Sequence, residues 1–180
     1  MVLDLNMIII KNKLEKVYDL DQTYRQETGK LISSGQLSKE EYEKLYDSKF
    51  KKIDDQNIKV VCDILDKYGF IEKERIGYKA SYAQYLVIQH APHEIKLKYQ
   101  SVIEEAVNNG KLSRSDYAHF VDRVLVEEGK KQIYGTQYKF DEKSGKYELE
   151  PIENNENINE IRKEMGLPSF EEDASVVNRR

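Results

Sequence analysis

The sequence has very little of several residue types that define common protein classes. Its 180 residues include one cysteine, three histidines, three prolines and no tryptophan. A single cysteine excludes a disulfide within the chain and a zinc site built from cysteines. The histidines, at positions 90, 93 and 119, lack the spacing typical of metal ligands. The sequence also has no glycine-rich phosphate loop and no nucleophile elbow. We therefore expect no metal site and no cofactor.

Long apolar runs and an excess of positive charge are also missing. The net charge is −4 and no segment is strongly basic, so we expect no nucleic-acid partner. No apolar run approaches the roughly 20 residues that span a membrane, so we expect no membrane partner. The apolar start, residues 1–13, is interrupted by Asp4 and is typical of a first helix rather than a signal peptide. These features predict a cytoplasmic protein.

What the chain does contain is helical periodicity over most of its length. Hydrophobic residues make up 39% of it and charged residues 34%, which is enough to fill a core beneath a charged surface. We predict a mainly α-helical domain of about five to six helices with one short β-hairpin near residues 131–150. The length fits a single domain, predicted over residues 1–168. Residues 169–180 are predicted to be a flexible C-terminal tail, because they have little to pack against.

The predicted helices have clear start and stop signals. Ser38 with Glu41 three residues later is typical of a capping box, and Gly69 is a natural stop for the helix that begins there. Pro92 ends one helix and suits the first turn of the next. The short connection between the first two helices predicts an antiparallel pair. The predicted ranges are about 6–32, 38–68, 79–90, 92–109, 113–129 and 157–165, with a glycine-bounded loop at 69–77.

The period changes after Gly129. The stretches QIYGTQYKF (132–140) and KYELEPI (146–152) alternate and are joined by DEKSG, which is typical of a β-hairpin. We expect Gln132, Tyr134 and Thr136 on one face of the first strand, with Gly135 allowing a close approach of backbone or ligand. That face is predicted either to close over a polar cluster or to be a hairpin edge with satisfied side chains.

Polar residues interrupt the apolar stripes of three predicted helices. Asp21 and Arg25 are four residues apart on the first, so they can pair. Asn57 points inward on the second, and His90 ends the third, where the helix dipole favours a protonated ring. Burying such groups without partners would cost about 1–3 kcal/mol each. The pattern therefore predicts either one satisfied structural network or a ligand site.

Four segments together resemble a known family. LDQTYR (20–25), LVIQHA (86–91), FVDRVLVEEGKKQIYGTQ (120–137) and PIENNENINEIRKEMGLP (151–168) are similar to a bacterial family of uncharacterised proteins, domain-of-unknown-function family 6624. The resemblance covers about residues 17–170 and implies a residue pattern rather than a reaction. Its polar members in this sequence are Asp21, Gln22, Arg25, Asn57, His90, Asp122, Arg123, Gln132, Tyr134, Gly135, Thr136, Gln137 and Arg162.

Two positions depart from the family pattern. Within two residues after the histidine the family often has aspartate, and four residues further on it has glutamine. Here these positions are Pro92 and Lys96. If that acid serves a reaction or a ligand contact, this chain has lost it or has specialised.

Two functional hypotheses and one structural alternative follow. In the first, an enzyme acts on a small polar molecule or peptide. His90 is its general acid or base, oriented by Asp21 or Asp122. The ligand-binding residues are then Gln22, Arg25, Asn57, Arg123, Gln132, Tyr134, Thr136, Gln137 and Arg162.

In the second hypothesis the chain is a non-enzymatic binding, accessory or immunity-type interaction protein, which Pro92 and Lys96 favour. The partner is a small molecule, a peptide or a protein. The structural alternative is a purely structural polar core. Under either functional hypothesis we expect Asp21, Arg25, Asn57 and His90 to lie together, with Gln132 or Tyr134 at their edge.

Overall fold

The computed structural model describes residues 5–141, 146–153 and 156–177. Contacts divide the chain into two compact units, residues 1–111 and 112–180, and each is described here by itself. The single domain expected from the length stays a prediction. None of the helices in these described ranges is long and apolar enough to cross a membrane.

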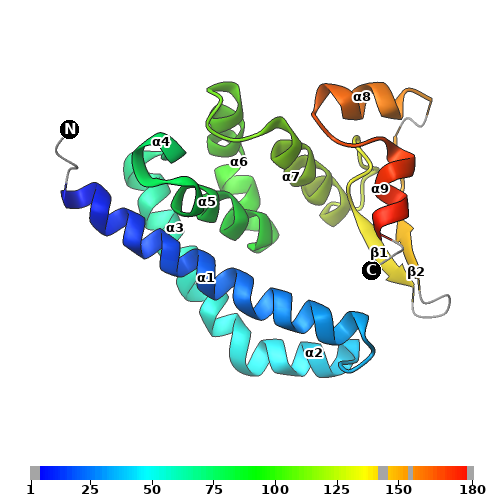
Figure 1. The fold of residues 1–180 in the computed structure, drawn as a ribbon, viewed down its shortest axis with the longest axis horizontal. Helices are drawn as coiled ribbons and strands as arrows, with labels where there is room; N and C mark the ends of the chain where they lie inside the picture. The colour runs from blue at the N-terminus through cyan, green and yellow to red at the C-terminus, as the bar shows by residue number, and fades with distance from the viewer. Residues whose placement is uncertain (1–4, 142–145, 154–155, 178–180) are drawn as a thin grey trace. The chain divides into compact units, whose positions relative to one another are not determined.

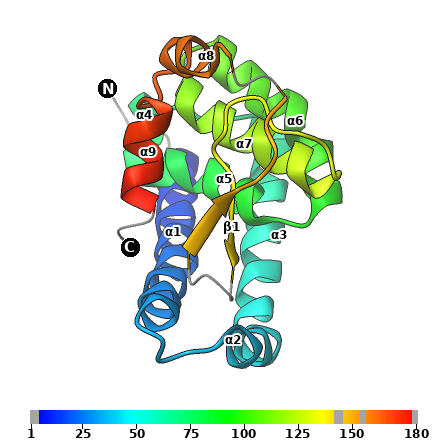
Figure 2. The same cartoon turned by 90° about the vertical axis from the view of Figure 1, so that its right-hand side faces the viewer.

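The first unit is built from helices, as the apolar periodicity predicted. Helix α1 and helix α3 run in opposite directions and are joined at one end through α2, and α5 packs against both (Figures 1 and 2). Leu14, Val61 and Ile88 have no exposed surface and form the centre of this core. The elements are α1 (Leu5–Ser33), α2 (Lys39–Leu45), η1 (Tyr46–Phe50), α3 (Lys51–Tyr68), α4 (Lys73–Ile76), α5 (Tyr78–His90) and α6 (His93–Asn108).

The second predicted helix begins as expected but is not uniform. Ser38 and Glu41 form the predicted capping box, with the Glu41 backbone N–H donating to Ser38 Oγ at 3.3 Å and Ser38 N–H donating to Glu41 Oε2 at 2.9 Å. The helix then widens into a π-helical turn, η1, before it continues as α3. A π-turn holds an extra residue and shifts the following side chains around the axis. The predicted loop at 69–77 contains the short helix α4.

The second unit contains the hairpin. Its elements are α7 (Arg114–Glu127), β1 (Tyr138–Asp141), β2 (Lys146–Leu149), α8 (Ile158–Glu164) and α9 (Phe170–Val177) (Figure 1). Strands β1 and β2 are antiparallel, with Tyr138 opposite Leu149, so the predicted hairpin is confirmed. The DEKSG connection falls largely on residues 142–145, outside the described residues.

The first strand begins later than predicted. Gln132 makes only an isolated bridge with Ile152, and residues 133–137 form a loop. The expectation that Gln132, Tyr134 and Thr136 share one face of a strand is therefore wrong. The physical reason is that backbone N–H groups of this stretch donate to the carboxylate of Asp122 instead of to a neighbouring strand.

The predicted flexible tail contains a helix. Phe170–Val177 form α9, and Ser169 with Glu172 makes a second capping box, since Ser169 N–H donates to Glu172 Oε2 at 3.0 Å and Glu172 N–H donates to Ser169 Oγ at 3.3 Å. Arg162 Nη2 donates to Asp173 at 2.9 Å and ties the helix to α8. Residues 178–180 lie outside the described residues.

Candidate functional site

Helices α1, α3 and α5 bring four of the predicted polar residues together in the first unit. Asp21, Arg25, Asn57 and His90 line a single narrow recess, which Asp54, Ile58 and Val87 complete and which has no room for a water molecule. Their shared position on the inward stripes of three helices explains this grouping. Their role as a functional site stays a prediction.

The pair of Asp21 and His90 is the centre of this recess. His90 Nδ1 lies 3.1 Å and 3.2 Å from the two carboxylate oxygens of Asp21. Asp21 is buried, whereas 20% of the His90 side chain is exposed. Because Asp21 holds Nδ1, the ring nitrogen that would exchange a proton with a substrate is Nε2.

The electrostatics of the recess keep Asp21 ionised. Burial by itself raises the pKa of Asp21. The hydrogen bond and charge of His90, together with the charge of Arg25, outweigh this effect and hold the pKa below its ordinary value. Gln22 Nε2 also donates to Asp21 at 2.8 Å. Asp21 therefore remains a carboxylate across the physiological pH range.

Arg25 bridges two carboxylates. Its Nε donates to Asp21 at 3.1 Å and its Nη2 donates to Asp54 at 2.9 Å. Burial alone lowers the pKa of Arg25, but the two carboxylates more than compensate and raise it. Two of the five N–H donors of the guanidinium are used in this way, so the others are available to an anionic group.

Asp54 is the member of the cluster that sequence reasoning missed. The hydroxyls of Tyr24 and Tyr46 donate to it at 2.7 Å and 2.9 Å, and Arg25 pairs with it. Burial and the hydrogen bond to Asp54 raise the pKa of Tyr46 to about 12, so its hydroxyl stays protonated as a donor. The helical phase of Phe50, Asp54 and Asn57 was a signal that would have identified Asp54.

Asn57 differs from the other residues of the recess. It is 3% exposed, and among the described residues its Nδ2 has no hydrogen-bond acceptor. Leaving a buried donor unpaired costs about 1–3 kcal/mol. A ligand that offered an acceptor to Asn57 would remove this cost.

Asp122 belongs to the second unit and has a different environment. Its carboxylate is fully buried and accepts hydrogen bonds from the backbone N–H groups of Ile133, Tyr134 and Thr136 at 2.8 to 3.0 Å. Thr136 Oγ1 adds a fourth donor at 2.9 Å. These bonds occupy the acceptor capacity of the carboxylate. The geometry supports a structural role in which Asp122 shapes the loop.

Gln132 closes the same loop from its other side. Its side chain is fully buried, and its Nε2 donates to the carbonyls of Gln137 at 3.1 Å and Glu150 at 2.7 Å. Its Oε1 accepts from the backbone N–H of Gln137 at 2.9 Å. Gln132 thus replaces the strand pairing that this stretch lacks.

Arg162 is the third buried support of the loop. It has no exposed surface, and its Nη1 donates to the carbonyls of Tyr134 and Gly135, each at 2.8 Å. Its Nε donates to the carbonyl of Pro168 at 2.8 Å. Gly135 has a φ of +69° and lies against Arg162. The QIYGTQ stretch is therefore a loop held between the buried carboxylate of Asp122 and the buried guanidinium of Arg162.

The remaining predicted ligand-binding residues lie around this loop. Gln137 Nε2 donates to Thr136 Oγ1 at 2.9 Å, and Arg123 is half-buried beside Asp122 on α7. Burial and the nearby charge of Asp122 raise the pKa of Tyr134. The expected placement of Gln132 or Tyr134 at the edge of the helical cluster stays a prediction.

The two departures from the family pattern lie just after α5, at Pro92 and on α6. Pro92 is the residue immediately before α6, and Lys96 is buried with its Nζ donating to the carbonyl of Ala91. A cation at the C-terminal end of a helix interacts favourably with the helix dipole. Lys96 therefore secures the helix end that carries His90.

The chemistry offered by the first unit is acid–base chemistry and anion binding. An imidazole and a guanidinium are partly exposed, and two carboxylates lie beneath them. Within the described parts of the chain, no group of three or more His, Cys, Asp or Glu side chains is arranged to hold a metal ion.

Comparison with known proteins gives a family but no relative of known activity. No curated protein and no solved structure matches the chain. Residues 11–179 match the model of a family described as "Family of unknown function (DUF6624)", so the chain belongs to this family.

Proposed function

We propose that the chain is an enzyme acting on a small polar molecule or peptide, with His90 as its general acid–base group. The observation that carries this proposal is the contact of His90 Nδ1 with both carboxylate oxygens of the buried Asp21. A carboxylate in this position fixes the tautomer and orientation of the ring and stabilises the imidazolium that forms when Nε2 accepts a proton.

Arg25 supports the same proposal. Its guanidinium is fixed by Asp21 and Asp54, and its remaining N–H groups suit a carboxylate or phosphate on a substrate. His90 and Arg25 belong to α5 and α1, which pack directly against each other. A substrate with an anionic group and a proton to exchange would engage both.

The alternative is a non-enzymatic binding, accessory or immunity-type protein. The size of the recess favours it, because the recess cannot hold a water molecule, whereas ordinary small-molecule pockets have volumes of roughly 300–1,000 Å³. A bound group would then contact His90 and Arg25 from outside. The buried departure at Lys96 is a second reason to keep this alternative.

The experiment that separates the two uses the full chain and chromogenic substrate panels of carboxylic esters, amino-acid amides and phosphoesters. We expect turnover of one class by the parent protein. In His90→Gln and Asp21→Asn we expect it to fall by about 10²–10⁴-fold, the usual contribution of a positioned acid–base group.

His119→Gln is the matched control, since this exposed histidine lies on α7 and its Nδ1 contacts the carbonyl of Ser115. The acid–base role is wrong if His90→Gln keeps parental turnover. Absence of turnover by the parent across all three classes would favour the binding alternative.

A further inference from the structure

A second concave surface of the first unit lies between α1 and α3. Its volume of about 460 Å³ falls within the range of small-molecule sites, roughly 300–1,000 Å³. We call it the α1–α3 groove. It is lined by Lys13, Lys16, Val17, Leu20, Gln56, Asn57, Lys59, Val60, Asp63 and Ile64.

The floor of the groove is apolar. Val17 and Leu20 of α1 face Val60 and Ile64 of α3 across it. Leu20 is 39% exposed although it lies beside these buried or half-buried neighbours. An apolar body placed here would remove aliphatic surface from water, at about 25 cal/mol for each Å².

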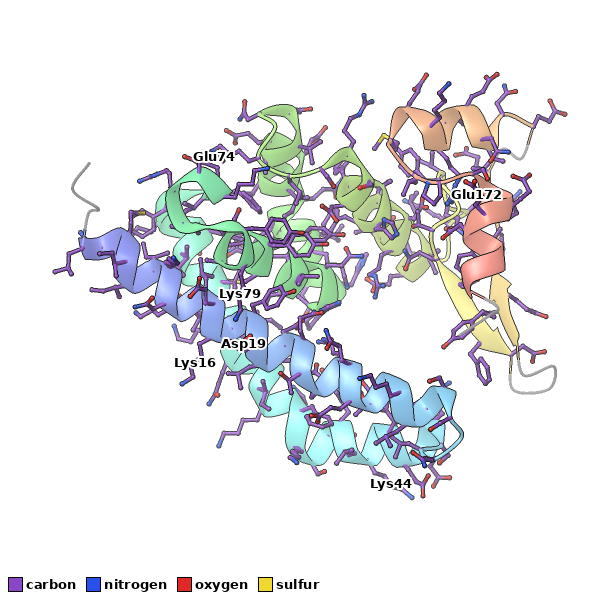
Figure 3. The ribbon with its side chains drawn as sticks, in the orientation of Figure 1. Lys16, Asp19, Lys44, Glu74, Lys79 and Glu172 are labelled. Carbon is purple, nitrogen blue, oxygen red and sulfur yellow. The ribbon has the colours of Figure 1, made fainter. Side chains whose placement is uncertain are left out.

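The rim of the groove is positively charged. Lys59 pairs with Asp63 at 2.7 Å, which neutralises both. Lys13 and Lys16 are exposed on α1 and form no ion pair with any described residue, and Lys16 projects outward from α1 in Figure 3. By contrast, Lys79 of α5 pairs with Asp19 of α1 at 2.6 Å, and Figure 3 shows these two residues side by side. The groove therefore has two uncompensated cations.

The inner wall contains an unsatisfied donor. Asn57 lines both the groove and the recess of Asp21 and His90, and its buried Nδ2 has no acceptor among the described residues. A ligand oxygen that reached this amide would satisfy it. This observation is independent of the lysines and also points to a ligand with an oxygen acceptor.

We propose that the α1–α3 groove binds a small amphiphilic anion, with an apolar body on the aliphatic floor and an anionic oxygen group at Lys13, Lys16 and Asn57. The lining of α1 spans Lys13 to Leu20, about 10 Å of helix. That length, with the width of the groove, suits one alkyl chain or one aryl group. It is small for a partner protein, whose stable interfaces bury on the order of 1,200–2,000 Å². The proposal does not depend on acid–base chemistry at His90.

The test is a titration of the full chain with dodecanoate below its micellar concentration, followed by calorimetry and by ¹H–¹⁵N NMR. We expect saturable binding at one site, with shifts at the Asn57 side-chain amide and at the backbone amides of Leu20 and Val60. In the double variant Lys13→Glu/Lys16→Glu we expect binding to weaken about tenfold or more, because two attractive charges become repulsive.

The matched control is Lys39→Glu/Lys52→Glu, which makes the same change of charge at two exposed lysines outside the groove. It should bind dodecanoate as the parent does. Leu20→Gln tests the apolar floor and should also weaken binding, because it replaces aliphatic surface with an amide. Leu20 is 39% exposed, so this change need not disturb the core.

Three results would overturn the proposal. The first is the absence of saturable binding. The second is equal binding of dodecanol and dodecanoate, with no effect of the lysine variants, which would show that charge plays no part. The third is lysine-dependent binding of an acidic amphipathic peptide when dodecanoate fails to bind, which would make the groove a protein-docking surface.

Discussion

At the scale of single residues, Arg25 supports the recess more than His90 does, because it bridges the buried carboxylates of Asp21 and Asp54. We predict that Arg25→Gln lowers the free energy of unfolding by about 2–3 kcal/mol, somewhat less than the loss for a fully buried pair. His90→Gln should be near neutral, because a glutamine amide can still donate to Asp21. Urea unfolding monitored by circular dichroism measures both changes.

The difference in stability between these two variants shows whether His90 is needed for folding. A loss in His90→Gln as large as that in Arg25→Gln would make the imidazole part of the scaffold. The acid–base proposal would then lose its basis, since a ring needed for folding is not thereby shown to serve a reaction.

The low pKa of Asp21 predicts a dependence of stability on pH. Its folded-state pKa lies below the ordinary value of 3.8, because the His90 and Arg25 contributions outweigh the effect of burial. The unfolded state therefore binds more protons in this range. The stabilisation is present above about pH 4 and is lost as the pH falls through the folded-state pKa.

Asp21→Asn removes this titration. We expect the free energy of unfolding of the variant to fall less steeply than that of the parent between about pH 4 and pH 3. Urea unfolding at closely spaced pH values measures it. Parallel pH profiles of parent and variant would contradict the assignment of a lowered pKa to Asp21.

The sequence predicted the members of the recess unevenly. Asp21, Arg25, Asn57 and His90 were identifiable because helical phase is encoded locally, and each lies on an inward stripe. The hydrogen bond of Tyr46 to Asp54 was not predictable, because it depends on the π-helical turn that precedes α3. The packing of three helices, rather than any local pattern, decides which inward polar groups meet.

At the scale of elements, the QIYGTQ stretch shows how a buried acid overrides a local pattern. Its alternation predicted a strand, yet its backbone donors turn toward Asp122 on α7. We predict that Asp122→Asn lowers the free energy of unfolding by about 2–3 kcal/mol, because an amide N–H₂ group would face backbone donors and the charge would be lost. Thermal unfolding measures this loss, with Arg123→Gln on the same helix as a comparison. If Asp122→Asn is as stable as the parent, Asp122 has no structural role in the loop.

Gly135 is the position where this loop depends on glycine. Its φ is +69°, and a Cβ added there would lie 3.1 Å from Ile152 Cδ1 and 3.7 Å from Arg162 Nη1. Gly129 has a φ of +70° and open space around it, so it is a matched control for backbone strain alone. We predict a loss of about 1–2 kcal/mol for Gly129→Ala. The loss for Gly135→Ala should be clearly larger, and equal losses in chemical denaturation would mean that the contact with Ile152 is of no consequence.

At the scale of the whole molecule, the mainly helical class and the hairpin followed from periodicity, but the division of contacts did not. The length predicted one domain, which stays a prediction, and contacts group residues 1–111 and 112–180 as compact units. Periodicity describes the faces of individual elements and says little about which elements share a core. The spacing of Ser169 and Glu172 in the sequence is that of a capping box. The prediction of a flexible tail considered only that this terminal segment has little to pack against.

The last prediction concerns whether the two units unfold together. The hydrogen bonds of Asp54 with Tyr24, Tyr46 and Arg25 lie within residues 1–111. Those of Asp122 lie within residues 112–180. We therefore expect Asp122→Asn to reduce native-state hydrogen-exchange protection across 112–180 while leaving 1–111 as in the parent, and Arg25→Gln to do the reverse. Amide exchange reports such cooperative units separately when they open independently. If either variant lowers protection by the same amount throughout the chain, the protein unfolds as one cooperative domain, as its length alone predicted.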